Sequence, residues 1–282
     1  MTGRAALAVA AWLLLQGCRP SVEEELQRGK DARFERKPEA ALQAFRRALD
    51  RLDRDASASA QVLRARALAG AAEVYDVELG DARRAVEVYR ELLRACPESP
   101  EALAARPRLA ALLKDRFGDA RGAIQVLNDA LARSPPESAE LRYQVASLYF
   151  TLGDHAQASL EAAEVVRRFE ASAWVDDALL LQGQSLQLKG RPREALAAFE
   201  ALAARFPDGE LRPHALYEQG RVLMGLGARD RAVAVWLEAL KVHPQPALVR
   251  AELDRVRRIV DAETPPALGR EEAFRGPGEK GR

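Results

Sequence analysis

The sequence contains very few residues of the types that most often carry chemistry. Its 282 residues include two cysteines, three histidines and 6% aromatic residues. Two cysteines, Cys18 and Cys96, are too few for a disulfide framework. His155, His214 and His243 are widely spaced and accompany no cysteine or carboxylate at metal-ligand spacing, which favours surface or turn positions over a metal site. We therefore expect no metal and no cofactor.

Net charge and long hydrophobic stretches are also scarce. The chain carries 43 basic and 42 acidic residues, so its formal charge of +1 attracts neither nucleic acid nor anionic lipid as a whole. The clearest apolar run, residues 5–15, has eleven residues. That is about half of the ~20 residues that a bilayer-spanning helix needs. We expect no nucleic-acid partner.

Motifs for catalysis are absent as well. The sequence contains no serine-nucleophile elbow and no phosphate-cradling loop. Residues 276–281 match the spacing of a dinucleotide-binding fingerprint, but without the strand and helix that the motif requires. The paired carboxylates Asp176 and Asp177 fall at an expected helix start, where they interact favourably with the helix dipole. We therefore expect no enzymatic activity and no small-molecule substrate.

The N-terminus has the features of a secretory signal. Arg4 precedes the apolar run of residues 5–15, which has the length of a signal-peptide core. The following residues, Leu15-Gln16-Gly17-Cys18, resemble the signal of bacterial lipoproteins, in which the cysteine is acylated and becomes the mature N-terminus. The resemblance implies a signal peptide at 1–17, lipidation of Cys18 and a short tether at 18–20. A plain signal peptide or a fortuitous cysteine is the alternative.

Lipidation of Cys18 would have two consequences. Cys96 would have no intrachain partner, and its position before Pro97 at a helix end indicates a small buried hydrophobic side chain. Arg19 is not the aspartate that retains some lipoproteins in the inner membrane. The resemblance therefore implies a protein that faces the periplasm and is attached to the outer membrane rather than the inner one.

A five-residue phrase beginning with alanine recurs six times along the chain. The leading residues are Ala41, Ala85, Ala123, Ala158, Ala195 and Ala232, at intervals of 44, 38, 35, 37 and 37 residues. Periods of this size are typical of stacked helix pairs, in which each pair buries its apolar face on its neighbours. The sequence therefore predicts an all-α solenoid and favours binding over catalysis.

The last two repeats show what each position in the phrase does. In residues 213–244, Gly220 allows close helix approach, Gly227 supplies positive φ at the turn, Trp236 fills the space between helices, and Pro244 ends the second helix. The same positions in residues 176–207 hold Gly183, Gly190, Phe199 and Pro207. This pattern resembles the tetratricopeptide repeat signature over about 22–244. The resemblance implies a right-handed superhelical solenoid of about six antiparallel helix pairs, at 21–245.

Several irregularities modify this expectation. The second and third repeats hold one extra residue before the turn, and the 44-residue interval with residues 55–59 suggests a longer connection between repeats. Pro107 lies inside an expected helix and should kink it or delay its start. A capping-box pattern places the first helix start at Ser21. At the other end, helical spacing predicts a capping helix at 246–262, and the composition predicts a disordered tail at 263–282.

In the resembled family, the first helices of the pairs line a groove that holds an extended peptide or a partner helix. Carrying those positions over to the three clearest repeats implies a protein-binding groove formed by nine residues. These residues are Tyr143, Ser147, Phe150, Leu180, Gln184, Gln187, Tyr217, Arg221 and Met224. The alternative is that Tyr143, Phe150 and Met224 only pack between adjacent repeats. The Lys/Asn set that clamps a C-terminal carboxylate in some members is absent, which argues against that adaptor role.

These inferences combine into one functional hypothesis. The sequence resembles repeat-containing envelope lipoproteins, such as those of barrel assembly, which implies a lipid-anchored periplasmic scaffold that binds protein partners in an envelope assembly. The alternative is an accessory factor that recruits or regulates a cell-wall (peptidoglycan) enzyme. Either way, the expected partners are proteins in the groove and the membrane through the N-terminal lipid.

Overall fold

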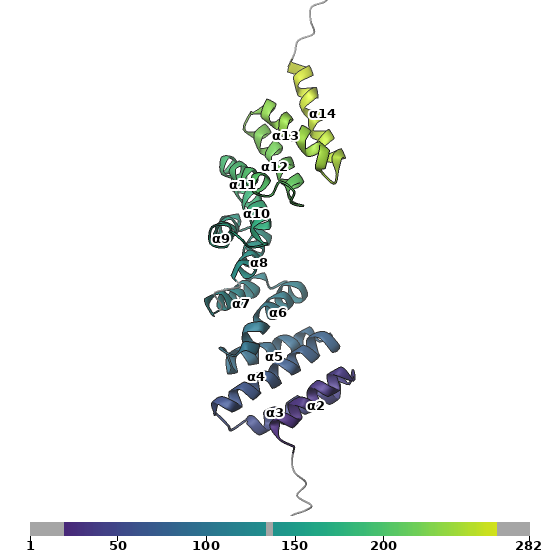
Figure 1. The fold of residues 1–282 in the computed structure, drawn as a ribbon, viewed down its shortest axis with the longest axis vertical. Helices are drawn as coiled ribbons and strands as arrows, with labels where there is room; N and C mark the ends of the chain where they lie inside the picture. Colours follow the sequence, from purple (N-terminus) through teal and green to yellow (C-terminus); the bar gives the residue numbers. More distant parts are fainter. Residues whose placement is uncertain (1–19, 134–137, 264–282) are drawn as a thin grey trace, which may run out of the picture. The chain divides into compact units, whose positions relative to one another are not determined.

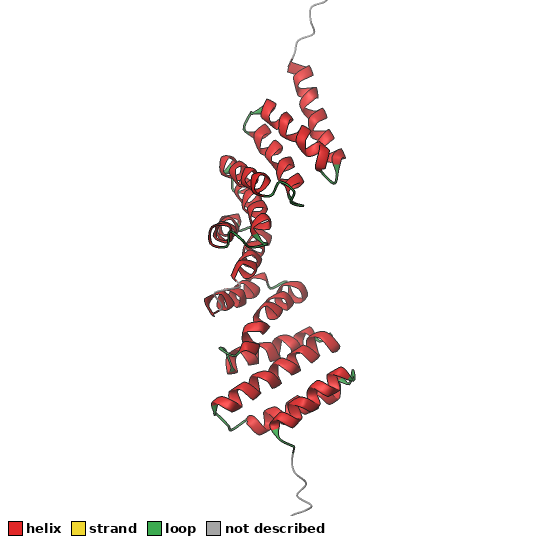
Figure 2. Cartoon of the chain, viewed as in Figure 1, coloured by secondary structure: helices red, strands yellow, loops and turns green. Residues whose placement is uncertain are grey.

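A computed structural model describes residues 20–133 and 138–263 of the chain. These residues form helices joined by turns and short loops, with no strand among them (Figure 2). The chain divides into two compact units, Met1–Leu148 and Tyr149–Arg282. The predicted signal peptide, the predicted lipidation site Cys18 and the predicted tail from residue 264 onward lie outside the described residues.

The helices follow one another as first and second members of pairs (Figure 1). The first unit contains α2 (Val22–Phe34), α3 (Pro38–Leu52), α4 (Ala58–Glu73) with its π-helical extension η1 (Val74–Glu78), α5 (Ala82–Ala95), α6 (Pro100–Phe117) and α7 (Ala120–Arg133). Helix α8 (Ser138–Thr151) begins in the first unit and ends in the second. The second unit continues with α9 (His155–Arg168), α10 (Val175–Leu188), α11 (Pro192–Arg205), α12 (Arg212–Gly225), α13 (Arg229–Val242) and α14 (Pro246–Glu263). The predicted all-α array of helix pairs with a closing helix is thus confirmed, and the described residues form six such pairs.

The leading alanines of the six repeats all lie in the core. Each stands on the second helix of its pair and has 0% of its surface exposed: Ala41, Ala85, Ala123, Ala158, Ala195 and Ala232. A methyl group at this position allows the two helix backbones to approach closely, whereas a larger side chain would separate them. The repeat that is visible in the sequence is therefore a repeat of close helix crossings.

Glycine and a large aromatic ring face each other at several crossings, as predicted. A Cβ atom added to Gly220 would lie 2.1 Å from Nε1 of Trp236, and one added to Gly183 would lie 2.4 Å from Cε1 of Phe199. In the first unit the Phe45 ring has a glycine on each of two helices, with added Cβ atoms at 2.5 Å (Gly29) and 2.6 Å (Gly70). Real Cβ atoms do not approach other atoms so closely, so any side chain at these glycines would displace the ring.

The turns inside the pairs depend on left-handed backbone conformations. Gly190 and Gly227 have φ of 75° and 76°, as predicted, and three further turn glycines are also in this region. The first turn differs, because Arg36 (φ 57°) occupies the position that glycine holds in the other turns. A non-glycine residue in this conformation costs roughly 1–2 kcal/mol.

Arg36→Gly should therefore stabilise the first unit by about 0.5–1 kcal/mol, because relief of the strain exceeds the extra chain entropy of glycine. Chemical denaturation followed by circular dichroism would measure the change. Glu35→Gly is the matched control, because Glu35 has φ −77° and gains nothing from glycine. A loss of stability in both variants would show that Arg36 is not strained.

The long first repeat interval has a different origin from the one expected. Only residues 53–57 connect α3 to α4, which is no more than the residues 206–211 between α11 and α12. The prediction of a longer connection is therefore wrong. The extra length lies in the first helix of the second pair, where the Leu79 N–H donates to the Val74 carbonyl at 3.0 Å across a π-helical turn. This turn accommodates the extra residue that the sequence places before the glycine.

Helix starts follow local capping signals. The predicted capping box at Ser21 is present, since its Oγ accepts from the Glu24 N–H at 3.1 Å and its own N–H donates to Glu24 Oε2 at 3.1 Å. Helix α6 begins at Pro100, so the predicted delay of its start at Pro107 is wrong. The helix continues through Pro107, which has no N–H to donate to the carbonyl of Leu103.

Candidate protein-binding grooves

The second unit has an open cavity of about 320 Å³ between its first helices and the closing helix α14. Three of the predicted groove residues line it: Gln187 on α10, and Arg221 and Met224 on α12. The rest of the lining comes from α12, α13 and α14, namely Gly225, Trp236, Glu252, Arg255, Val256 and Ile259. The cavity therefore combines an apolar interior with charged groups at its rim, which is the usual composition of a binding site.

Both arginines of this cavity are held by acidic residues of their own helices. Arg221 pairs with Glu218 at 3.2 Å, and Arg255 pairs with Glu252 at 3.8 Å, each three residues apart. The two arginine side chains are 46% and 71% exposed. Exposed pairs of this kind contribute about 0–1 kcal/mol, so an incoming carboxylate can compete for either guanidinium.

The other predicted groove residues of the second unit are used differently. The Tyr217 ring lies 5.6 Å from the His243 ring, centroid to centroid, on the segment that leads into α14. Burial raises the pKa of the Tyr217 phenol, and the Glu252 carboxylate raises it further. Phe150 packs edge-on against His155 at 5.2 Å. Both rings thus contact side chains of the second unit, while their use in partner binding stays a prediction.

The remaining predicted residues do not line the cavity. Leu180 and Gln184 are half-buried on α10, and Leu180 packs against the core of the second unit. Tyr143 and Ser147 are half-buried on the part of α8 that belongs to the first unit. The structure thus brings Gln187, Arg221 and Met224 together, while binding by the nine residues stays a prediction.

Among the cavities of the first unit, one is bordered by two first helices and was not predicted from the sequence. It measures about 420 Å³ and lies between α4 with η1 and α6, over Tyr89 of α5. Its lining is Ala69, Glu73, Val77, Tyr89, Glu101, Ala104, Ala105 and Arg108. The resemblance to the repeat family was used to predict groove residues only in the three clearest repeats, which lie in the later part of the chain. The sequence did contain a signal for this cavity, the four-residue spacing of Ala69 with Glu73 and of Ala104 with Arg108. Residues at this spacing lie on one face of a helix.

Charged groups surround this first-unit cavity. Arg108 donates to Asp76 at 2.6 Å, and this hydrogen bond raises the pKa of the Arg108 guanidinium. Burial, with the nearby charge of Asp76, raises the pKa of Tyr89 to about 12. Glu101 has its Oε1 atom 3.6 Å from Nε of Arg66, while its Oε2 atom is buried and has no hydrogen-bond partner.

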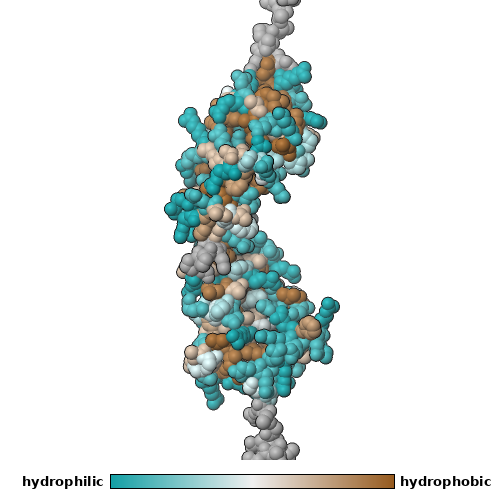
Figure 3. Space-filling model, in the orientation of Figure 1, coloured by the Kyte–Doolittle hydropathy of each residue, from teal (hydrophilic) through white to brown (hydrophobic). Residues whose placement is uncertain are grey.

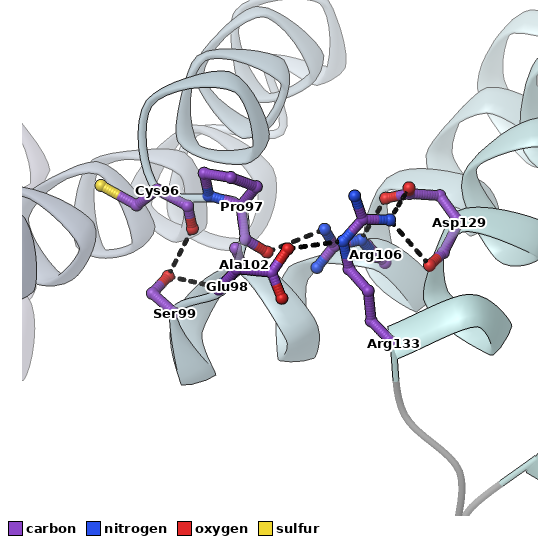
Figure 4. A network of polar contacts seen from close by, with 8 residues as sticks. All are labelled: Cys96, Pro97, Glu98, Ser99, Ala102, Arg106, Asp129 and Arg133. Atoms are coloured by element: carbon purple, nitrogen blue, oxygen red, sulfur yellow. Dashed lines mark hydrogen bonds and ion pairs between the residues drawn. The ribbon is translucent and has the colours of Figure 1, made fainter.

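A buried arginine joins the two helices of the third pair, α6 and α7, to the loop that precedes them (Figure 4). Arg106 has 1% of its surface exposed and donates to Asp129 Oδ2 at 2.7 Å and to the Pro97 carbonyl at 2.9 Å. Arg133 binds the same Asp129 from the surface and donates to Glu98 at 2.9 Å. Burial lowers the pKa of Arg106. This network holds α6 against α7. Because α6 forms one wall of the first-unit cavity, the network also fixes the position of that wall.

Two histidines that are distant in the sequence lie together in the second unit. The His214 and His243 rings have centroids 5.1 Å apart, and the Gln245 N–H donates to His243 Nδ1 at 3.0 Å. Within residues 20–133 and 138–263 no group of three or more His, Cys, Asp or Glu side chains could hold a metal ion. Cys96 is buried, as expected, and burial raises the pKa of its thiol.

The surface of each unit carries apolar patches between hydrophilic side chains (Figure 3). None of the helices in the described ranges combines the length and the apolarity that crossing a bilayer requires. Stacked helix pairs whose first helices border open cavities define a helical repeat protein of the kind that serves as an interaction scaffold.

The family follows from the sequence profile. The tetratricopeptide repeat profile matches residues 26–100, 108–173 and 180–247, and the chain belongs to the tetratricopeptide repeat family. Repeats of this family are scaffolds for protein–protein interaction, and the chain is a scaffold of this type. No curated protein sequence matches the chain.

Solved structures share the fold. YrrB, described as a TPR protein with an unusual peptide-binding site, is 18% identical with a TM-score of 0.55, covering 76% of this chain and all (100%) of YrrB. A MamA protein is 22% identical with a TM-score of 0.52, covering 62% of this chain and 90% of MamA. MamA from Desulfovibrio magneticus RS-1 is 15% identical with a TM-score of 0.51, covering 64% of this chain and 94% of that one. At these identities the likeness concerns the fold alone.

Proposed function

We propose that the chain is a scaffold that binds protein partners of an envelope assembly through the cavities of its two units, while a lipid on Cys18 anchors it to the outer membrane. The observation that carries the proposal is the pair of open cavities, about 420 and 320 Å³, each bordered by first helices. Cavities of this size can hold one or two anchoring side chains of a partner. The peptide-binding site named for YrrB is consistent with such a use of the fold.

The two cavities suit segments of a protein better than a small molecule. Both are open troughs rather than enclosed chambers, and both mix apolar lining with arginine and glutamate. Apolar anchors supply affinity, and rim charges select the sequence around them. A partner that engaged both units would gain effective concentration for the second contact once the first had formed.

The anchor is supported by the sequence before the first helix. Leu15-Gln16-Gly17-Cys18 resembles a lipoprotein signal, and the capping box at Ser21 starts α2 three residues after Cys18. Three residues span at most about 11 Å. A lipid on Cys18 would therefore hold the first pair of helices close to the bilayer. Several acyl chains together give stable attachment, whereas one chain binds only marginally.

Cys18→Ala should move the protein from the membrane fraction to the soluble fraction, because the acylated thiol is lost. Fractionation of cells and immunoblotting would measure the distribution. Cys96→Ala, which changes the other cysteine, should leave the protein with the membrane. Retention of the Cys18→Ala variant in the membrane fraction would refute the lipid anchor.

The partner can be assigned to one of two classes by crosslinking in intact envelopes, followed by purification and mass spectrometry. Barrel-assembly components in the purified complex would support the envelope-assembly role. Peptidoglycan hydrolases or synthases would support the alternative of an accessory factor for a cell-wall enzyme. Crosslinks to neither class would refute both roles.

A further inference from the structure

Three of the eight residues that line the first-unit cavity are alanines. Ala69 lies on α4 and Ala104 and Ala105 lie on α6, and the rest of the lining consists of Val77, Tyr89 and three charged side chains. Beneath them lies Tyr89, which is 2% exposed and therefore belongs to the core. The chain thus leaves space where a side chain of ordinary size would have closed the gap, and an extended segment can approach the two helices closely.

The walls of this cavity hold two carboxylates with different surroundings. Glu73 is engaged, since its Oε2 accepts from Arg33 at 2.5 Å. Glu101 is only partly engaged, because Arg66 approaches Oε1 at 3.6 Å and no donor reaches the buried Oε2. The Glu101 side chain is 24% exposed and its one ion pair is long, so a cationic group bound in the cavity can pair with this carboxylate.

The basic residue that lines the same cavity is already neutralised. Arg108 donates to Asp76 at 2.6 Å, and the Asp76 side chain is 12% exposed. This leaves Glu101 as the lining residue whose hydrogen-bonding capacity is incomplete. The second-unit cavity has the opposite character, with two arginines and one glutamate in its lining. The two cavities therefore favour ligands of different charge.

We infer that the first-unit cavity selects a partner segment in which a lysine or arginine is flanked by small residues. The small residues lie over the alanines of the lining, and the cationic side chain pairs with the Glu101 carboxylate, whose side chain is 24% exposed. This inference rests on the proposed function, since it names the chemistry of a segment bound in one of the two cavities.

Selection from a phage-displayed library of random dodecapeptides on the detergent-solubilised full chain would test the inference. We expect the selected peptides to share a Lys or Arg next to Ala, Gly or Ser. Changing that residue to leucine in a synthetic copy should raise the dissociation constant at least tenfold. Glu101→Gln should also raise the dissociation constant at least tenfold. Combining the peptide change with Glu101→Gln should raise it little more than either change alone. Glu23→Gln, which changes an exposed glutamate on α2 that does not line this cavity, should have no effect.

Two blocking variants separate the failure of this inference from the failure of the proposed function. Ala104→Trp fills the first-unit cavity from an exposed position, and Gln187→Trp fills the second-unit cavity. Two outcomes would overturn the inference and leave the proposed function intact. In the first, Ala104→Trp blocks the binding of peptides that lack a basic residue. In the second, only Gln187→Trp blocks the binding of the selected peptides. Selection of no peptide, or of peptides insensitive to both variants, would overturn the proposed function itself. The leucine-substituted peptide needs no protein variant, so the inference stays testable if Glu101→Gln unfolds.

Discussion

Gly220→Ala should lower the free energy of unfolding of the second unit by about 1–3 kcal/mol. The added methyl carbon would lie 2.1 Å from Nε1 of Trp236, a ring with only 1% of its surface exposed. The ring cannot move away freely, because its Nε1–H donates to the Tyr217 carbonyl at 3.0 Å. Trp174 and Trp236 both lie in the second unit, so the fluorescence of tryptophan during urea denaturation reports this transition.

The same helix provides the control for this substitution. Gly225 is the last residue of α12, and a Cβ atom added there meets no other atom within 4 Å. Gly225→Ala should therefore leave stability unchanged or raise it by up to about 1 kcal/mol, since alanine is the better helix former. If the two substitutions had equal effects, the glycine at position 220 would not be required for close packing against Trp236.

Asp129→Ala should destabilise the first unit by about 3 kcal/mol, because it leaves a buried guanidinium with too few partners. Arg106 would keep the Pro97 carbonyl at 2.9 Å, and its Nη1 already has no hydrogen-bond partner. The cost falls at the low end of the range for a broken buried pair, since the Asp129 side chain is itself 39% exposed. Chemical denaturation followed by circular dichroism would measure the loss.

Arg133→Ala is the matched comparison, because it removes a surface arginine from the same carboxylate. The Arg133 side chain is 30% exposed, so the expected cost is below about 1 kcal/mol. Arg106→Met should also cost less than Asp129→Ala, since it removes the buried charge together with its need for partners. If Asp129→Ala and Arg133→Ala lowered the free energy of unfolding equally, the burial of Arg106 would make no difference to the stability of the first unit.

The features that the sequence predicted correctly are those fixed by spacing within one helix pair. Gly183 and Phe199 lie sixteen positions apart in a single hairpin, and so do Gly220 and Trp236, so their contact follows from the geometry of that hairpin. The capping box at Ser21 involves only residues 21–24. In each case the interacting residues are tied by a short stretch of chain, and the repeat shows the same solution more than once.

The features that were missed depend on contacts and helix geometry that the repeat pattern does not specify. Arg106 looks like a surface residue in the sequence, and only the position of Asp129 on the next helix and the Pro97 carbonyl make its burial tolerable. His214 and His243 are 29 residues apart and meet because the segment after α13 folds back on the start of α12. The π-helical turn at Val74–Glu78 shows how a helix absorbs one extra residue, a choice that length alone does not fix.

The residues of the candidate site also divide into those that the repeat pattern predicts and those that it does not. The positions of Gln187, Arg221 and Met224 could be assigned from the repeat, because every first helix presents the corresponding positions to one side. The role of α14 as a wall could not, since its Glu252, Arg255 and Ile259 stand outside the repeat pattern. The first-unit cavity was missed because the four-residue spacing of its alanines with Glu73 and Arg108 is common in helices, and only the structure shows that these faces border one cavity.

The central claim, that partners are held on the faces of the first helices, can be tested by site-specific photo-crosslinking in living cells. A photoreactive amino acid would replace Ala104 or Gln187, which line the cavities, or Gln125 or Ala197, which are exposed on the second helices α7 and α11. We expect discrete protein adducts from positions 104 and 187 and none from positions 125 and 197. Adducts from 125 and 197 alone would contradict the account, because the partner would then contact the opposite faces of the pairs.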